Sequence, residues 1–271
     1  MRERRKKRRA AQGRTLLCVA SGLIYAFLML PLLVLFPISF SAGSYLTFPP
    51  PGFSLKWYVR YFGDVAWLDA TYRSLEIGAA TTVLALLFGL PLAFGLARGR
   101  FRGRALIENG ISAPIIVPHI VLSIAIYGLF SRLGLIGAWY GVALAHTVLA
   151  LPFVVIVILA GLRDFDITLE LAARGLGAGR LAAVLSVTLP ILAPSVYSAA
   201  FLAFITSFDE LVVAMFIAGA NMTLPKKMFD NILSEVEPTV AAVSAMQIVL
   251  VSALLILGSR LRRPRAAPMM P

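Results

Sequence analysis

The sequence predicts an all-α polytopic membrane protein with six transmembrane helices. Of its 271 residues, 59% are hydrophobic and only 14% are charged, whereas soluble domains carry about 25% charged residues. Six apolar stretches are each long enough to cross the hydrocarbon core of a bilayer, which takes about 20 residues of helix. The basic residues also alternate between successive loops, which is typical of membrane proteins with a fixed orientation.

The six predicted spans occupy most of the chain between two basic ends. The first span is too long for the apolar part of a cleaved signal peptide, which covers about 7–15 residues. Residues 1–14 form a basic arm and residues 261–271 a basic tail, so the membrane domain is predicted to cover residues 15–260. The spans are predicted at 15–38, 74–97, 106–130, 139–161, 192–217 and 239–259.

The distribution of lysine and arginine predicts that both termini are cytoplasmic. The arm, the loops at 98–105 and 162–191 and the chain after 259 contain 19 of the 25 basic residues. Basic residues are retained on the cytoplasmic side, and an even number of spans also places both ends on one side. The net charge of +12 therefore follows the topology and does not indicate a nucleic-acid partner. The arm is interpreted as an orientation signal rather than a specific ligand site, although it also suits contact with anionic lipid.

The sequence has none of the motifs that would make this chain an enzyme or a nucleotide-binding subunit. The patterns G-x-x-x-x-G-K-[ST], H-E-x-x-H and G-x-S-x-G are absent. The single cysteine, Cys18, offers neither a disulfide framework nor a metal cluster. We therefore expect no cofactor, no metal and no catalytic residue. His119 and His146 fall within spans, where hydrogen-bonded packing is favoured over a proton relay, and Ser123 one turn after His119 does not by itself predict a hydrolase.

Asp209 and Glu210 are the acidic residues that most need an explanation, because acids inside a transmembrane span are costly and usually functional. In a continuous helix over 192–217, Asp209 would lie roughly 12 Å from the outer end, and the two side chains would point about 100° apart. Carboxylates along an aqueous path attract cations. We predict that both acids line a substrate path, with Ser207 adding a hydrogen bond. A structural pair that is bonded to a neighbouring helix is the alternative.

A semi-polar segment, residues 163–190, interrupts the apolar pattern between the fourth and fifth spans. Asp166 is a candidate N-cap of a short helix, and Gly177 with its neighbouring glycines is a candidate to end that helix. A second short helical run is predicted over 180–189, with Pro190 marking the turn into the fifth span. We expect two short helices at a right-angled bend near the cytoplasmic membrane surface.

The same segment resembles the EAA loop of permease subunits of ABC importers. That pattern reads E-A-A, three residues, G, nine residues, I, one residue, L-P. The residues in register here are Ala172, Ala173, Gly177, Leu189 and Pro190, with Val187 in place of the isoleucine. Leu171 stands at the position of the motif glutamate, and Glu170 lies one residue earlier. The salt-bridging role of that glutamate is therefore either lost or passed to Glu170.

Other stretches resemble the spermidine/putrescine branch of these permeases, and in particular its second permease subunit. The stretches are FPPPGFSLKWYVRYF, AHTVLALPFVVIVILAGLRDFD, SFDELVVAMFIAG and TLPKKMFDNI. The resemblance implies the fold of a type I ABC importer permease in a bacterial inner membrane. It also implies three kinds of protein partner within the lipid bilayer and at its faces: a second permease subunit, a dimer of ATP-binding subunits and an extracytoplasmic substrate-binding protein.

The resemblance further implies that the 163–190 loop docks on the ATPase as a coupling helix. The residues assigned to this coupling are Glu170, Ala172, Ala173, Gly177, Leu189 and Pro190. The implied substrate is a polyamine such as spermidine or putrescine. Import of an opine, a phosphonate or a metal by the same class of importer is an alternative. A self-contained secondary carrier is a further alternative, and the internal repeats that such carriers often show are not found.

Overall fold

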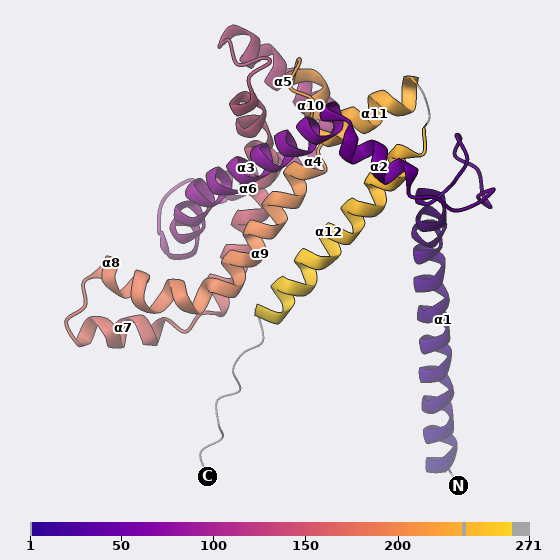
Figure 1. The fold of residues 1–271 in the computed structure, drawn as a ribbon. Helices are drawn as coiled ribbons and strands as arrows, with labels where there is room; N and C mark the ends of the chain where they lie inside the picture. Colours follow the sequence, from indigo (N-terminus) through magenta and orange to yellow (C-terminus); the bar gives the residue numbers. More distant parts are fainter. Residues whose placement is uncertain (1, 235–236, 262–271) are drawn as a thin grey trace. The chain divides into compact units, whose positions relative to one another are not determined.

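The computed structural model describes residues 2–234 and 237–261 (Figure 1). Within these ranges all regular elements are helical, apart from one isolated β-bridge between Ser41 and Phe53. The all-α prediction is thus confirmed. The predicted basic tail, residues 261–271, falls outside the described residues except for its first position. The chain divides into two compact units, one made of residues 1–64 and 231–250 and the other of residues 65–230 and 251–271.

The first unit is built on two helices and part of a third. They are α1 (Arg2–Ser39), α2 (Lys56–Gly63) and the first part of α12 (Thr239–Leu261). Because α1 begins at Arg2, the predicted basic arm and the first span belong to one helix. The indole N–H of Trp57 donates to the carbonyl of Ser41 at 2.9 Å and fastens the connecting segment to α2. Arg60 pairs with Glu237 at 3.0 Å.

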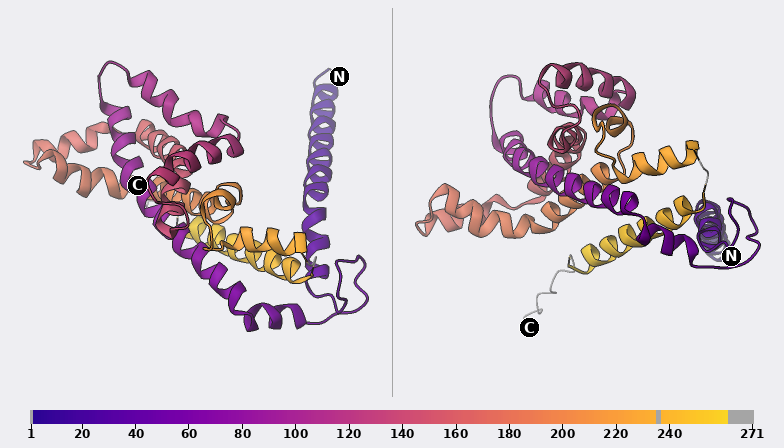
Figure 2. Two further views of the ribbon diagram at one scale, coloured as in Figure 1. Left: turned by 90° about the horizontal axis from the view of Figure 1, so that it is seen from above. Right: turned by 45° about the horizontal axis from the view of Figure 1, so that its top comes forward.

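Three long helices form the core of the second unit (Figure 2). They are α3 (Val65–Arg98), α6 (Trp139–Asp164) and α9 (Leu189–Phe208). Glycines allow their backbones to approach closely. A Cβ added at Gly89 would meet Val154, and one added at Gly161 would meet Ser195. Such small-residue contacts stabilise helix pairs in lipid, where the hydrophobic effect between helices is absent.

Among the residues that the structure describes, five helical stretches are long and apolar enough to span a bilayer, and a sixth span results if α4 and α5 are counted as one broken span. The helices α4 (Arg104–Ile116) and α5 (His119–Arg132) meet at 108°. The prediction of a continuous third span at 106–130 is therefore wrong. Val117 has the extended backbone (φ −73°, ψ 131°) that a residue before proline prefers, and Pro118 is the N-cap of the new helix α5, which begins at His119.

The fifth span begins earlier than predicted. A continuous helical stretch runs from α8 (Arg180–Ala183) through a π-helical turn (Val184–Thr188) into α9. The predicted turn at Pro190 is wrong, because Pro190 lies in the first turn of α9. Its missing N–H falls directly after the π-helical turn, where the hydrogen-bond pattern already changes.

The fifth span also ends earlier than predicted. α9 stops at Phe208, and a separate short helix, α10 (Val212–Ile217), follows. Asp209 and Glu210 therefore lie in a break between two helices. The expected continuous helix to residue 217 is wrong, and so are the depth and the 100° separation that were inferred from it. The remaining helices are α7 (Ile167–Gly175) and α11 (Leu224–Ser234).

Candidate functional site

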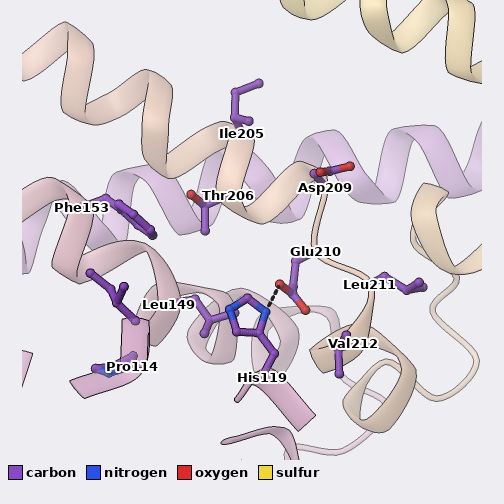
Figure 3. Close-up of a pocket in the computed structure, with 11 residues that line it drawn as sticks. Pro114, His119, Leu149, Phe153, Ile205, Thr206, Asp209, Glu210, Leu211 and Val212 are labelled. Atoms are coloured by element: carbon purple, nitrogen blue, oxygen red, sulfur yellow. Dashed lines mark ion pairs between the residues drawn. The ribbon is translucent and has the colours of Figure 1, made fainter. Parts of the chain in front are cut away.

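A cavity of about 410 Å³ lies in the second unit at the two helix breaks (Figure 3). The break between α4 and α5 contributes one wall, the break between α9 and α10 contributes another, and α6 contributes a third. The residues on which the chemistry of this cavity depends are His119, Phe153, Thr206, Asp209 and Glu210. The rest of the lining is apolar, so the two carboxylates stand in a mostly hydrophobic wall.

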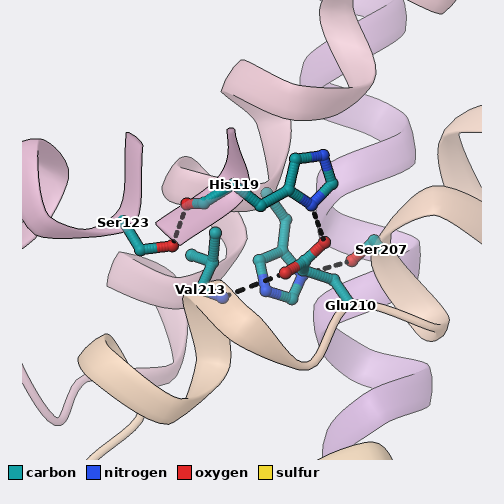
Figure 4. A network of polar contacts seen from close by, with 6 residues as sticks. His119, Ser123, Ser207, Glu210 and Val213 are labelled. Carbon is teal, nitrogen blue, oxygen red and sulfur yellow. Dashed lines mark hydrogen bonds and ion pairs between the residues drawn. The ribbon is translucent and has the colours of Figure 1, made fainter. Parts of the chain in front are cut away.

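Both carboxylate oxygens of Glu210 have partners (Figure 4). Oε2 lies 3.3 Å from Nδ1 of His119, the first residue of α5. Oε1 accepts a hydrogen bond of 2.9 Å from the N–H of Val213 in the first turn of α10. The Glu210 side chain is only 6% exposed. Glu210 thus joins the beginnings of two helices, where a negative charge is favourable.

The neighbouring acid has different surroundings. Asp209 is exposed and lines the cavity, and its side chain points away from His119 (Figure 3). Its own N–H donates to the carbonyl of Ile205 and closes the end of α9. Among the residues that the structure describes, no hydrogen bond or ion pair engages the Asp209 carboxylate. The two adjacent acids therefore differ: one is bonded within the chain, and the other is open to a ligand.

Ser207 lies in a buried chain of hydrogen bonds and not in the cavity lining. Its hydroxyl donates to Thr81 Oγ1 at 3.2 Å, and Thr81 in turn donates to the carbonyl of Ala143 at 3.2 Å. Since the Ser207 proton is used in this way, Nδ1 of His146, 2.8 Å from Ser207 Oγ, is assigned as the donor to it. Ser207 therefore connects α9 to α3 and α6, and His146 has the packing role that the sequence favoured.

The side chains of His119 and Ser123 do not form a nucleophile–base pair. The Ser123 hydroxyl donates to the backbone carbonyl of His119 at 2.7 Å (Figure 4). This is the common bond of a helical serine to the preceding turn. The histidine ring instead faces Glu210.

The predicted docking segment forms a hairpin of α7 and α8 that projects from α6 and α9 (Figures 1 and 2). Asp166 caps α7, because its Oδ1 accepts from the N–H and from the hydroxyl of Thr168 at 2.9 and 2.7 Å. These two hydrogen bonds hold the pKa of Asp166 below its ordinary value. At the other end, Gly177 has φ +98° and its N–H donates to the carbonyl of Arg174. The predicted N-cap and the predicted terminating glycine are both confirmed.

Glu170 is buried between the hairpin and the end of α3. Its Oε2 lies 2.7 Å from Nη1 of Arg98 and accepts a hydrogen bond of 2.7 Å from the hydroxyl of Thr188. Burial raises the pKa of Glu170, but the bond from Thr188 and the interactions with Arg98 together lower it further, so the net pKa lies below the ordinary value. Leu171, at the position of the motif glutamate, is 53% exposed.

The other predicted coupling residues lie in two places. Ala172 and Gly177 are exposed on the hairpin, and Ala173 is half-buried. Leu189 and Pro190 lie at the beginning of α9, directly after Thr188. The bond from Thr188 to Glu170 thus brings the two parts of the motif together.

The sequence did not reveal the partners of the two buried acids. Arg98 counted only as one basic residue of a predicted cytoplasmic loop, and Thr188 only as part of the predicted short helical run over 180–189. His119 directly follows a Val-Pro pair, and this helix-breaking signal was the available hint that it stands at a helix start.

The fold is that of the membrane subunits of ABC importers. It is similar to a chain of a bacterial ABC transporter involved in the import of the acidic polysaccharide alginate, with a TM-score of 0.69 and 20% sequence identity. The match covers 90% of this chain and 94% of that chain.

Sequence relatives specify the family. Residues 85–263 match the family of the binding-protein-dependent transport system inner membrane component. The chain is 32% identical over 242 residues to the spermidine/putrescine transport system permease protein PotC of Haemophilus influenzae, covering 89% of this chain and 93% of the relative. It is 32% identical over 234 residues to the putrescine transport system permease protein PotI of Escherichia coli K12, covering 82% of each.

The chain therefore belongs to the family of binding-protein-dependent transport system inner membrane components. It is a multi-pass inner-membrane permease subunit of an ABC importer and not an enzyme. Membership of this family implies a separate ATPase and a substrate-binding protein as partners.

Proposed function

We propose that this chain forms half of the translocation path for a polyamine-like cation and couples that path to a separate ATPase. The names of the two permease relatives support a polyamine substrate. The observation that carries the proposal is the carboxylate of Asp209, which no described residue engages and which stands in a largely apolar cavity. A second permease subunit completes the path, and both termini of this chain face the cytoplasm.

The cavity suits an alkyl ammonium group. Asp209 attracts the positive charge, the ring of Phe153 offers a surface for a cation, and the hydroxyl of Thr206 offers a hydrogen-bond acceptor. The apolar remainder of the wall contacts the methylene groups between the charges of a polyamine. Glu210 connects the beginnings of α5 and α10 through its contacts with His119 and Val213 and does not bind the substrate directly.

A metal or an anion fits the same wall less well. Among the described residues no group of three or more His, Cys, Asp or Glu side chains can hold a metal ion, and hard divalent cations need several oxygen ligands. An anionic solute such as a phosphonate would meet the negative charge of Asp209. An organic cation is therefore favoured over the other solutes considered.

The α7–α8 hairpin is the proposed lever to the ATPase. Ala172 lies about 200° around α7 from the buried Glu170, so it faces away from the chain's own core. Small side chains at Ala172 and Ala173 permit close approach of a docking partner, and Gly177 sets the turn of the hairpin. Leu189 and Pro190 continue into α9, so a push on the hairpin acts on a transmembrane helix directly.

The test is uptake by the complete importer in proteoliposomes, with the ATPase and the binding protein present and labelled putrescine as the probe. The variant Asp209→Asn is expected to lower uptake at least about tenfold while leaving assembly unchanged. The matched control is Asp69→Asn, which changes an exposed acid outside the cavity. Wild-type uptake by Asp209→Asn would overturn the cation site, and uptake by this chain alone in pure lipid would favour a self-contained carrier.

A further inference from the structure

The exposed side chains of the α7–α8 hairpin include several leucines and two arginines. We propose that the surface on the ATPase subunit that receives it is a groove with an apolar floor and carboxylates along its edge. This inference rests on the proposed coupling role of the hairpin and adds the chemistry of the partner surface. It follows from how the hairpin uses its own charged side chains.

The hairpin's acidic side chains are already bonded within the chain. Residues 166–190 contain two acids, Asp166 and Glu170. Asp166 is bonded to Thr168 as the helix cap. Glu170 is 7% exposed and bonded to Arg98. Glu170 is therefore not available as a contact for a basic residue of the partner, and the exposed Asp166 already uses Oδ1 as the cap of α7.

The two arginines of the hairpin remain on its surface. Arg174 and Arg180 are exposed, and in the part of the chain that the structure describes neither forms an ion pair of the kind that engages Arg98 and Arg163. The charge of Arg174 makes only the smallest of the contributions that lower the pKa of Glu170. Exposed arginines favour a partner with carboxylates, because complementary charge steers association and fixes its register.

Three leucines supply the apolar part of the face. Leu171, Leu176 and Leu181 are 53%, 91% and 72% exposed and come from α7, the turn and α8. Exposed apolar clusters with polar rims mark interaction sites. Leu176 stands at the tip of the hairpin because its N–H and that of Gly177 are bonded back to carbonyls of α7.

A concave protein surface is favoured over the bilayer surface as the occupant. A helix that lies on lipid presents one continuous apolar stripe along its length. Here the leucines are distributed over a short helix, a left-handed turn and a second short helix, which together form the projecting hairpin (Figure 1). A tip of fixed shape matches a groove better than a plane.

The experiment measures how firmly the ATPase is retained by the purified permease pair in detergent, as a function of NaCl concentration. The double variant Arg174→Glu/Arg180→Glu is expected to weaken retention about tenfold at low salt and to remove most of its salt dependence. The variant Leu176→Asp is expected to abolish retention. Arg102→Glu, which reverses the charge of an exposed arginine in the 98–105 loop outside the docking segment, is the control and should change retention by at most about twofold.

The outcomes separate the two levels of the proposal. If both the arginine double variant and Leu176→Asp lose retention of the ATPase, the result supports the acidic groove. If only Leu176→Asp loses retention of the ATPase, the result overturns the acidic edge but agrees with the coupling role of the hairpin. Wild-type retention by all variants overturns the coupling role itself. An arginine effect that appears only in bilayers with anionic lipid, and not in detergent, overturns the groove in favour of a lipid contact. Arg174→Gln/Arg180→Gln replaces the charge reversal if that variant does not assemble.

Discussion

Glu170 Oε2 lies 2.7 Å from Nη1 of Arg98, so the acid nearest the coupling motif is bonded to α3 of its own chain. The Arg98 guanidinium also lies over the rings of Phe94 and Phe165, at 5.0 and 6.0 Å from their centroids. The pair therefore fastens the hairpin to the C-terminal end of α3. Movement of the hairpin is expected to act on α3 through this contact as well as on α9 through the chain itself.

Breaking this pair should uncouple ATP hydrolysis from transport. Glu170→Gln and Arg98→Gln each remove the ion pair, at a cost of roughly 1–3 kcal/mol for the group left buried without a partner. We expect each variant to raise the amount of ATP hydrolysed per solute imported several-fold. The double variant should be little worse than either single one, because both remove the same interaction. Fully additive losses would contradict a shared role.

The same pair gives the hairpin a defined pH dependence. The pKa of Glu170 is lowered from the ordinary 4.5, so the folded hairpin binds a proton less readily than the unfolded one. The stabilisation is fully present above the unfolded pKa and is lost as the pH falls through the lower folded pKa. The protection of the α7 amides against exchange, taken relative to the intrinsic rate at each pH, should therefore stay high at neutral pH and fall only below about pH 4. Glu170→Gln should exchange faster at neutral pH and lose this transition.

Gly177 and Gly179 form a matched pair of positions for testing the hairpin turn. Both have open space where a Cβ would stand, but only Gly177 has a positive φ, at +98°. Gly177→Ala is expected to strain the turn by roughly 1–2 kcal/mol and to reduce ATPase stimulation by the loaded binding protein. Gly179→Ala keeps an ordinary backbone conformation (φ −65°) and should leave stimulation near the wild-type value. Equal effects of both changes would rule out a conformational cause.

Substitutions of the two adjacent acids, Asp209 and Glu210, should have different effects on the thermal stability of the permease. Glu210→Ala removes the acceptor for the Val213 N–H and the partner of His119, and should destabilise the permease by roughly 1–3 kcal/mol. Asp209→Asn breaks no described bond and should leave the thermal unfolding midpoint almost unchanged. The check is thermal unfolding of the detergent-solubilised complex. A similar loss for both variants would contradict the division into a structural acid and an open one.

Close helix packing predicts a strong contrast between two glycines of α3. Gly89→Val would push a branched side chain into Val154 of α6, because even an added Cβ meets Val154 there, whereas a Cβ added at Gly95 meets nothing within 4 Å. Both substitutions have the same effect on helix propensity, so a difference between them measures packing. For Gly89→Val alone we expect overpacking to destabilise the permease by roughly 1–3 kcal/mol. The amount of folded protein recovered from membranes should fall accordingly. Comparable yields of the two variants would contradict the close approach of α3 and α6.

The sequence by itself determined the membrane class, the approximate positions of the long helices, the cap at Asp166 and the turn at Gly177. These features depend on local properties: the length of an apolar run, a side chain that reaches a backbone N–H two residues away, and a residue without a Cβ at positive φ. They depend only on residues close together in the sequence, so they can be predicted without knowing how the rest of the chain folds.

Tertiary structure alone decided which of two adjacent acids is bonded and which is open, and to what Glu170 is attached. The partners of Glu210 and Glu170 include His119, 91 positions before the first, and Arg98, 72 positions before the second. Which distant groups meet is fixed by helix packing and by breaks at Val117 and Asp209, and hydrophobic patterning cannot supply that information. A carboxylate in an apolar region must find a partner or face water, but only the fold determines which of the two it does.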